Sequence, residues 1–307
     1  RPAVDHSYLL SIAAALFGNK KYKVSNHIDE EALWWFGQEG LEKFEALPTD
    51  GAEPQSQAFA EAQIFIQRKG PLYAIIDCGD HGLNGRGSHA QSDALSLEVF
   101  AYGHTFLRDP GTFVYTASEE WRNRFRSTEY HNTVRVDGQE ISQMSKGHLF
   151  TLGPNVRPRV NRWESTPEHD ILDAEHTAYH RLAEPVTHRR VVTFDKREGY
   201  WTIEDHFTGT GRHTFEFFFN FDAGLTATRC EDRAIVNGDE SALAIIPASG
   251  HALTAERVDR WVSLSYGTRV PSSGIIYRLE REVPFRHVTL LVPYRRGEEE
   301  KVERVKG

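Results

Sequence analysis

The chain has 307 residues with 44 acidic and 36 basic side chains, which give a net charge of −8 at pH 7. This acidic balance argues against a protein that binds nucleic acid or an anionic membrane through its overall charge. The longest apolar run near the start, residues 8–18, is too short to span a bilayer, and no signal sequence is visible. Two distant cysteines, Cys78 and Cys230, favour buried free thiols over a disulfide or a metal pair.

Two helical patterns open the chain. Apolar residues recur at helical spacing from Tyr8 to Leu16, with Gly18 as the expected stop, and Asp29 is a candidate N-cap for a second helix over residues 29–44. Two helices of this length cannot close a core by themselves. We therefore expect residues 1–48 to form a helical segment whose apolar faces, including two adjacent tryptophans, pack on the rest of the chain or, as we favour, on a missing segment.

The period of the apolar pattern changes from that of a helix to two at Gln57. Strands are expected at residues 59–67, 71–79, 94–103, 104–109, 132–138, 189–209, 213–221, 233–248, 260–267 and 287–294. Turn signals at Asp195–Gly199 and at Asn237-Gly238 predict hairpins inside two of these stretches. Because helix patterns are absent after about residue 50, residues 49–307 are expected to fold as a large antiparallel β-sandwich of the mainly β class.

Candidate metal ligands gather at the ends of the predicted strands. His89, Asp109 and His131 each lie at such an end, where neighbouring strands can bring distant residues to one point. A set of two histidines and one aspartate suits zinc or a similar divalent ion. Taken singly, Asp109 before Pro110-Gly111 also fits an ordinary turn residue.

Three arginines alternate within the segment EEWRNRFRS, residues 119–127. In an extended segment Arg122, Arg124 and Arg126 would share one side and offer a surface for carboxylates or sulfates. The alternative is a turn in which the two preceding glutamates pair with these arginines.

Three segments together resemble the motifs of the heparinase II/III-like family of polysaccharide lyases. They are GSHAQSDALS at residues 87–96, DPGTFVY at 109–115 and HNTVRVDG at 131–138. The resemblance implies the end of an incomplete (α/α) toroid over residues 1–48, followed by the family's antiparallel sandwich over residues 49–307. The active site of the family lies in the cleft between these two parts.

The chemistry that the resemblance implies is β-elimination at a uronic acid of an acidic polysaccharide. His89 matches the sandwich histidine that faces the cleft, so it is the expected catalytic residue. Tyr115 and the three arginines are the expected substrate contacts. The toroid of the family contributes an Asn, a Tyr and a His, which no segment before residue 50 supplies, so the fragment alone is expected to be inactive.

A structural metal ion is also implied by the resemblance. Asp109 and His131 match two of three zinc ligands in some members, whereas Gln91 stands in place of the third, a histidine. We expect weaker zinc binding, a harder divalent ion, or hydrogen bonds in place of a metal. Asp93 is expected to support the strand start instead of binding the ion.

Two further expectations accompany the family resemblance. Its members are usually periplasmic or secreted, so we expect the same of this protein. The substitution at Gln91 and the absent toroid residues leave open a different function, that of a non-catalytic carbohydrate-binding or structural sandwich.

Overall fold

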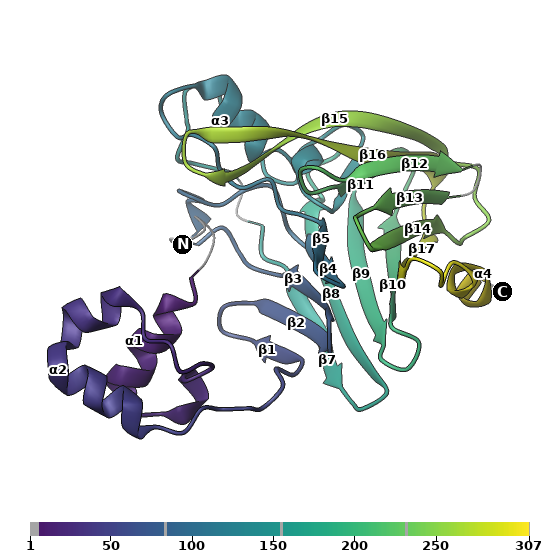
Figure 1. The fold of residues 1–307 in the computed structure, drawn as a ribbon. Coiled ribbons are helices and arrows are strands. Elements are labelled where there is room, and N and C mark those ends of the chain that lie inside the picture. The colour runs from purple at the N-terminus through teal and green to yellow at the C-terminus, as the bar shows by residue number, and fades with distance from the viewer. Residues whose placement is uncertain (1–5, 83–84, 154–155, 231–232, 307) are drawn as a thin grey trace. The chain divides into compact units, whose positions relative to one another are not determined.

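The computed structural model describes residues 6–82, 85–153, 156–230 and 233–306, and the chain divides into two compact units, Arg1–Pro54 and Gln55–Gly307 (Figure 1). The first unit holds helix α1 (Tyr8–Phe17), a 3-10 turn η1 (Lys20–Tyr22) and helix α2 (Glu30–Ala46). Gly18 ends α1 in the left-handed conformation, as predicted. Asp29 precedes α2, although its carboxylate accepts a hydrogen bond from the Ser11 hydroxyl (2.9 Å) and does not cap the helix.

The second unit is built from antiparallel strands and confirms the predicted mainly β fold. Its strands are β1 (Gln57–Phe59), β2 (Ile64–Lys69), β3 (Leu72–Asp77), β4 (Leu97–Ala101), β5 (His104–Leu107), β6 (Val134–Val136), β7 (Arg159–Ser165), β8 (His169–Tyr179), β9 (Val186–Asp195), β10 (Tyr200–Gly209), β11 (Arg212–Asn220), β12 (Thr226–Cys230), β13 (Arg233–Asn237), β14 (Ser241–Pro247), β15 (Thr254–Ser265), β16 (Thr268–Glu282) and β17 (Phe285–Arg295). The short helical elements with described bounds that accompany them are α3 (Glu119–Phe125), η3 (Thr128–Tyr130) and α4 (Glu300–Lys306).

The strands form three sheets that share one apolar core. The sheet orders are β1-β2-β3-β4-β5, β12-β13-β14-β17-β10-β9-β8-β7 and β15-β16-β11-β6. The main core takes side chains from all three, for example Val99, Phe194 and Phe217. The eight-stranded sheet also has an apolar second face, because alternate residues of β14 and β17 pack with Val302 of α4 in a separate cluster. Figure 1 shows α4 beside β17.

Both predicted hairpins are confirmed, since β9 pairs with β10 across Asp195 and Tyr200, and β13 pairs with β14 after Asn237. Cys78 is a buried free thiol, as expected, and the side chain of Cys230 lies outside the described part of the chain. Among the described residues, no helix combines the length and apolar character that crossing a membrane requires.

The expectation that helices are absent after about residue 50 is wrong, because α3, η3 and α4 all follow it. α3 begins after Ser118, whose hydroxyl accepts a hydrogen bond from the backbone N–H of Trp121, and Glu119 and Glu120 fill its first turn. A serine cap with acidic residues behind it is a helix start signal, which outweighed the alternation that had predicted an extended segment. Strands β7, β8, β12 and β16 were also not predicted.

Candidate functional site

The segment that carries His89, Gln91 and Asp93 is a loop, because β4 begins only at Leu97. The prediction that a strand runs from Ala94 is therefore wrong at its start. Leu95 adopts a positive φ of 62°, and backbone hydrogen bonds tie the loop to other segments, from Ser92 N to Arg126 O and from Leu95 N to Asp77 O, both 3.0 Å. The three polar side chains consequently do not share one strand face.

His89 is exposed and lies within a group of aromatic rings. The ring centroids of Tyr115 and Phe150 lie 5.2 and 5.9 Å from that of His89, and both rings meet it edge-on. Tyr266, which is 62% exposed between β15 and β16, lies 5.6 Å from Tyr115. We call His89, Tyr115, Phe150 and Tyr266 the aromatic group. The sequence pointed to the first two of its members, and no local pattern connected Phe150 or Tyr266 with them.

The tip of the β15-β16 hairpin is held over the segment that contains Tyr115. Ser263 N donates to Pro110 O (2.8 Å) and Gly267 N donates to Phe113 O (2.7 Å). Gly111 has a φ of 77°, and a Cβ atom there would lie 2.2 Å from the carbonyl oxygen of Ser263. Only glycine allows the two backbones to approach this closely.

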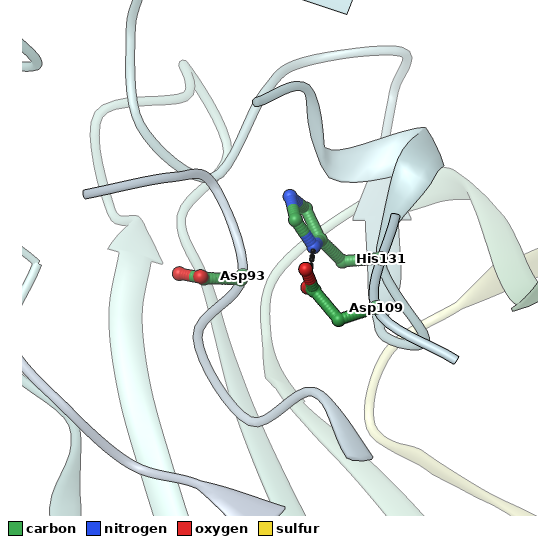
Figure 2. A group of neighbouring side chains, drawn as sticks. All are labelled: Asp93, Asp109 and His131. Carbon is green, nitrogen blue, oxygen red and sulfur yellow. Dashed lines mark hydrogen bonds and ion pairs between the residues drawn. The ribbon is translucent and has the colours of Figure 1, made fainter. Parts of the chain in front are cut away.

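The structure brings Asp109 and His131 together (Figure 2). The Nδ1 atom of buried His131 lies 2.7 Å from Oδ2 of Asp109, whose side chain is 34% exposed. Asp109 follows β5 and His131 follows η3, so strand ends do converge at this point. The alternative interpretation of Asp109 also holds, because its Oδ1 accepts a hydrogen bond from Gly111 N (2.9 Å) as a turn residue does.

Asp93 lies in the same cluster and is a candidate ligand, in addition to the supporting role that we expected for it. Asp93, Asp109 and His131 each offer one ligand atom, and these atoms lie within 4.8 Å of one another; Figure 2 shows Asp93 beside the other two. Gln91 lines one pocket together with Asp93 and Asp109. The Oε1 atom of Gln91 is buried and has no hydrogen-bond partner among the described residues. Three oxygen donors and one imidazole therefore fit a divalent cation.

The pocket around these groups has a volume of about 230 Å³ and collects carboxylates. Asp77, Asp93, Glu98 and Asp109 line it, and no lysine or arginine does so among the described residues. Loss of water raises the pKa of both Asp93 and Glu98 to about 7, and also raises the pKa of Asp77. Burial alone would lower the pKa of His131, but Asp109 and Asp93 raise it. We call this site the acidic pocket; its charge favours a bound cation.

The three arginines do not form the expected row, because α3 turns their side chains in different directions. Arg122 and Arg126 are buried, and Arg124 is exposed and lies 3.2 Å from Glu120. Arg126 donates to the backbone carbonyls of residues 148, 149 and 151. Of the alternative prediction, in which the preceding glutamates pair with these arginines, the pair of Arg124 with Glu120 is observed. Arg122 lies 5.1 Å from the Tyr115 ring centroid, and its two terminal nitrogens have no hydrogen-bond partner among the described residues.

Comparison with known families identifies the chain. A family model described as "Heparinase II/III-like, C-terminal" matches residues 51–300. The chain therefore belongs to the heparinase II/III-like family. This confirms the resemblance that the three motif segments carried, and the match extends through the whole sandwich.

Individual heparinase-like relatives agree with this assignment. A heparin-sulfate lyase from Pedobacter heparinus is 30% identical over 119 residues, which are 38% of this chain and 16% of that protein. The solved structure of heparan sulfate lyase HepC from Pedobacter heparinus gives a TM-score of 0.72 at 19% identity, over 96% of this chain and 42% of its own. A chondroitin AC lyase from Streptomyces coelicolor A3, solved with chondroitin sulphate, gives 0.56 at 16% identity, over 95% and 42%. The chain thus spans less than half the length of these relatives, and the structural likeness shows the fold.

Proposed function

We propose that this chain is the C-terminal part of a polysaccharide lyase that cleaves a uronic-acid-containing polysaccharide by β-elimination, with His89 as a catalytic residue. The observation that carries the proposal is the position of His89. It is exposed beside Tyr115 and Phe150, and its loop continues into the acidic pocket through Gln91 and Asp93.

In the proposed reaction a base takes the proton at C5 of the uronate, and the electron pair left behind forms a double bond between C4 and C5. The bond from C4 to its oxygen breaks, and an acid protonates the departing oxygen, which leaves an unsaturated sugar. The C5 proton is very weakly acidic, so the uronate carboxylate must receive hydrogen bonds that stabilise the enolate-like intermediate. In our proposal His89 donates such a bond or assists the proton transfer. Tyr115 and Tyr266 form the wall on which the sugar rests, and exposed Arg124 attracts the anionic chain.

The remaining catalytic groups are proposed to come from the part of the relatives that this chain does not span. Activity should therefore be measured on the natural protein that contains this chain. Heparan sulfate and chondroitin sulfate are the first substrates to test, because relatives are named for them. Formation of the unsaturated uronate is followed by its ultraviolet absorbance.

The His89→Ala variant is expected to lose activity by about 100-fold or more, the usual contribution of a positioned acid or base. His180→Ala is the matched control, because His180 is exposed on the sandwich and the hydrogen bond described for its side chain is to Thr187. Equal rates for wild type and His89→Ala would remove His89 from the mechanism. Binding of acidic polysaccharide without any cleavage would favour the alternative, a non-catalytic carbohydrate-binding sandwich.

We also propose that the acidic pocket holds a structural divalent cation through Asp93, Asp109, His131 and the amide oxygen of Gln91. Such an ion supplies positive charge to the buried carboxylates and holds the loop that carries His89. The donor set here has three oxygens and one nitrogen, because Gln91 stands where the family has a second histidine. An oxygen in place of that imidazole favours a harder ion such as Mn²⁺ over Zn²⁺.

Calorimetric titration of metal-stripped protein with Mn²⁺, Ca²⁺ and Zn²⁺ tests this proposal. Asp109→Asn should weaken binding by about 10-fold or more, and Gln91→His should shift the preference towards Zn²⁺. Glu61→Gln, on an exposed residue outside the acidic pocket, is the control. Binding that is unchanged in Asp109→Asn, or absent in wild type, would contradict the proposal.

A further inference from the structure

A row of polar side chains crosses the core side of the eight-stranded sheet. β9 alternates between buried and half-buried residues, and its buried positions include His188 and Arg190 among apolar side chains. On β10, Asp205 is buried in the same way, and it stands directly opposite Arg190 in the strand register. A buried charge is costly unless it is paired and hydrogen-bonded, so the guanidinium of Arg190 requires partners within the core.

Asp205 holds Arg190 in a two-point contact. Nε of Arg190 lies 2.8 Å from Oδ1 of Asp205, and one Nη lies 3.1 Å from Oδ2. His188 Nε2 lies 2.7 Å from the same Oδ1, and the other ring nitrogen of His188, Nδ1, lies 3.2 Å from Nε2 of His176. Burial alone would raise the pKa of Asp205, but Arg190 and His188 hold it below its ordinary value. The guanidinium is therefore fixed in direction as well as charge.

The other Nη of Arg190 donates to two backbone carbonyls, Leu95 O at 2.8 Å and Asn132 O at 3.0 Å. Leu95 lies just before β4 of the five-stranded sheet, and Asn132 lies just before β6 of the four-stranded sheet. One guanidinium on the eight-stranded sheet thus contacts the segments that lead into both other sheets. Both contacted segments lead into the acidic pocket, because Leu95 follows Asp93 by two residues and Asn132 follows His131.

The side chain of Asn132 extends this link. Its Nδ2 donates to Leu97 O (2.9 Å) and to Arg108 O (3.3 Å), which lies next to Asp109. Its Oδ1 accepts from Asn220 N (2.6 Å). Arg190 therefore holds the carbonyl of Asn132, and Asn132 contacts the segments of Asp93 and Asp109 and adjoins His131, the three residues of Figure 2.

We propose that Arg190, oriented by Asp205 and His188, is a positioning residue that fixes the loop of His89 and Asp93 relative to Asp109 and His131. The proposal rests on the proposed function of that site. Arginine suits this role because its planar fork binds the carboxylate on one edge and keeps a donor nitrogen for the carbonyls. Lysine retains the charge but offers no such fork.

Hydrogen exchange with mass spectrometry on Arg190→Lys tests the proposal directly. Peptides covering residues 89–97 and 128–136 should exchange about tenfold faster or more, while the strands of the eight-stranded sheet keep their protection. Arg189→Lys is the matched control, because Arg189 makes a similar two-point contact with Asp173 (2.8 and 2.6 Å) one position along β9, and that contact reaches neither carbonyl. In the natural protein, kcat should fall by about 10- to 100-fold with little change in KM.

Unchanged exchange in the two peptides would overturn the proposal. A loss of protection spread evenly over the three sheets would also overturn it, since an even loss is expected from an ion pair that only stabilises the fold. If Arg190→Lys does not fold, His188→Leu replaces it, because leucine has no donor for Asp205 and the substitution leaves Arg190 in place. The same two peptides should then exchange faster, by a smaller factor. Inactive wild-type protein would refute the proposed function, whereas the exchange data would still decide the role of Arg190.

Discussion

Carboxylates lie in a buried core and in a half-buried pocket of this sandwich, and the two regions differ in what balances their charge. In the core, Arg190 and His188 contact Asp205 directly, and the pKa of Asp205 is lowered. In the acidic pocket, Asp93 and Glu98 share a site lined by other carboxylates, and their pKa is raised to about 7. The core supplies its own cation and is complete, whereas the acidic pocket has charge left for a ligand.

The largest effect is expected when the core pair is broken. Asp205→Asn leaves the buried guanidinium of Arg190 without its counter-charge, and should lower the free energy of unfolding by about 3–5 kcal/mol in urea denaturation. Asp173→Asn removes the partner of Arg189, whose side chain is 43% exposed although Asp173 itself is buried, and should cost less than Asp205→Asn. Equal losses from the two variants would end the distinction between a fully buried pair and a pair with one exposed partner.

Adding a cation to the acidic pocket should raise the stability of the protein, whereas breaking the core pair lowers it. Mn²⁺ at about a hundred times its Kd should raise the free energy of unfolding by about 2.7 kcal/mol, because the ion binds only the folded site. The same addition to Asp109→Asn, whose binding is expected to be about 10-fold weaker or more, should raise the free energy of unfolding by about 1.4 kcal/mol or less. Thermal unfolding with and without the ion measures both, and an equal rise in both proteins would place the ion elsewhere.

The two regions should also show different pH dependence in metal-free protein. Asp93 has a folded pKa of about 7, above its ordinary 3.8, so its contribution is fully present below the ordinary value and is lost as pH rises through about 7. The free energy of unfolding should fall on the order of 2 kcal/mol between pH about 5 and 8, since solvent screens a partly open pocket. The lowered pKa of Asp205 makes its contribution constant over that range and lost only in stronger acid.

Asp93→Asn should reduce the slope of this pH profile and leave the part that Glu98 produces, and Asp205→Asn should leave the slope unchanged at lower overall stability. Urea denaturation across the range measures the slope for each protein. A profile that keeps its full slope in Asp93→Asn would show that other groups produce it.

The smallest effect is expected from the exposed ion pair of α3. Arg124→Ala removes a contact with Glu120 one helical turn away, and should change the free energy of unfolding by no more than about 0.5 kcal/mol. A larger loss would mean that the exposed arginine supports the fold as the buried Arg122 and Arg126 do.

Local sequence patterns predicted the elements whose signals lie close together in the chain. Gly18 ended α1 as expected, and the Asp195–Gly199 turn joined β9 to β10. The motif segments likewise placed Asp109 near His131. The start of β4 was predicted wrongly, because alternation of polar side chains at residues 89–95 continues through a loop whose path is set by bonds to Asp77 and Arg126.

The parts of the site that the sequence did not reveal depend on strand order across distant segments. Tyr266 meets Tyr115 through a hairpin that lies about half the chain away, and Arg190 reaches Leu95 from another sheet. The alternation of β9 could have shown Arg190 as an inward charge, but its partner Asp205 is known only once the register is known. The closeness of Asp93 to Asp109 was not predicted for the same reason, since it depends on the fold.

We propose that the acidic pocket, unlike the core, is completed by a cation that holds the loop of His89. Anomalous diffraction from crystals of the natural protein grown with Mn²⁺ would locate this cation. We expect a single strong peak about 2.0–2.4 Å from oxygen atoms of Asp93 and Asp109 and from a nitrogen of His131. Ordered density for these three side chains with no peak between them would contradict it.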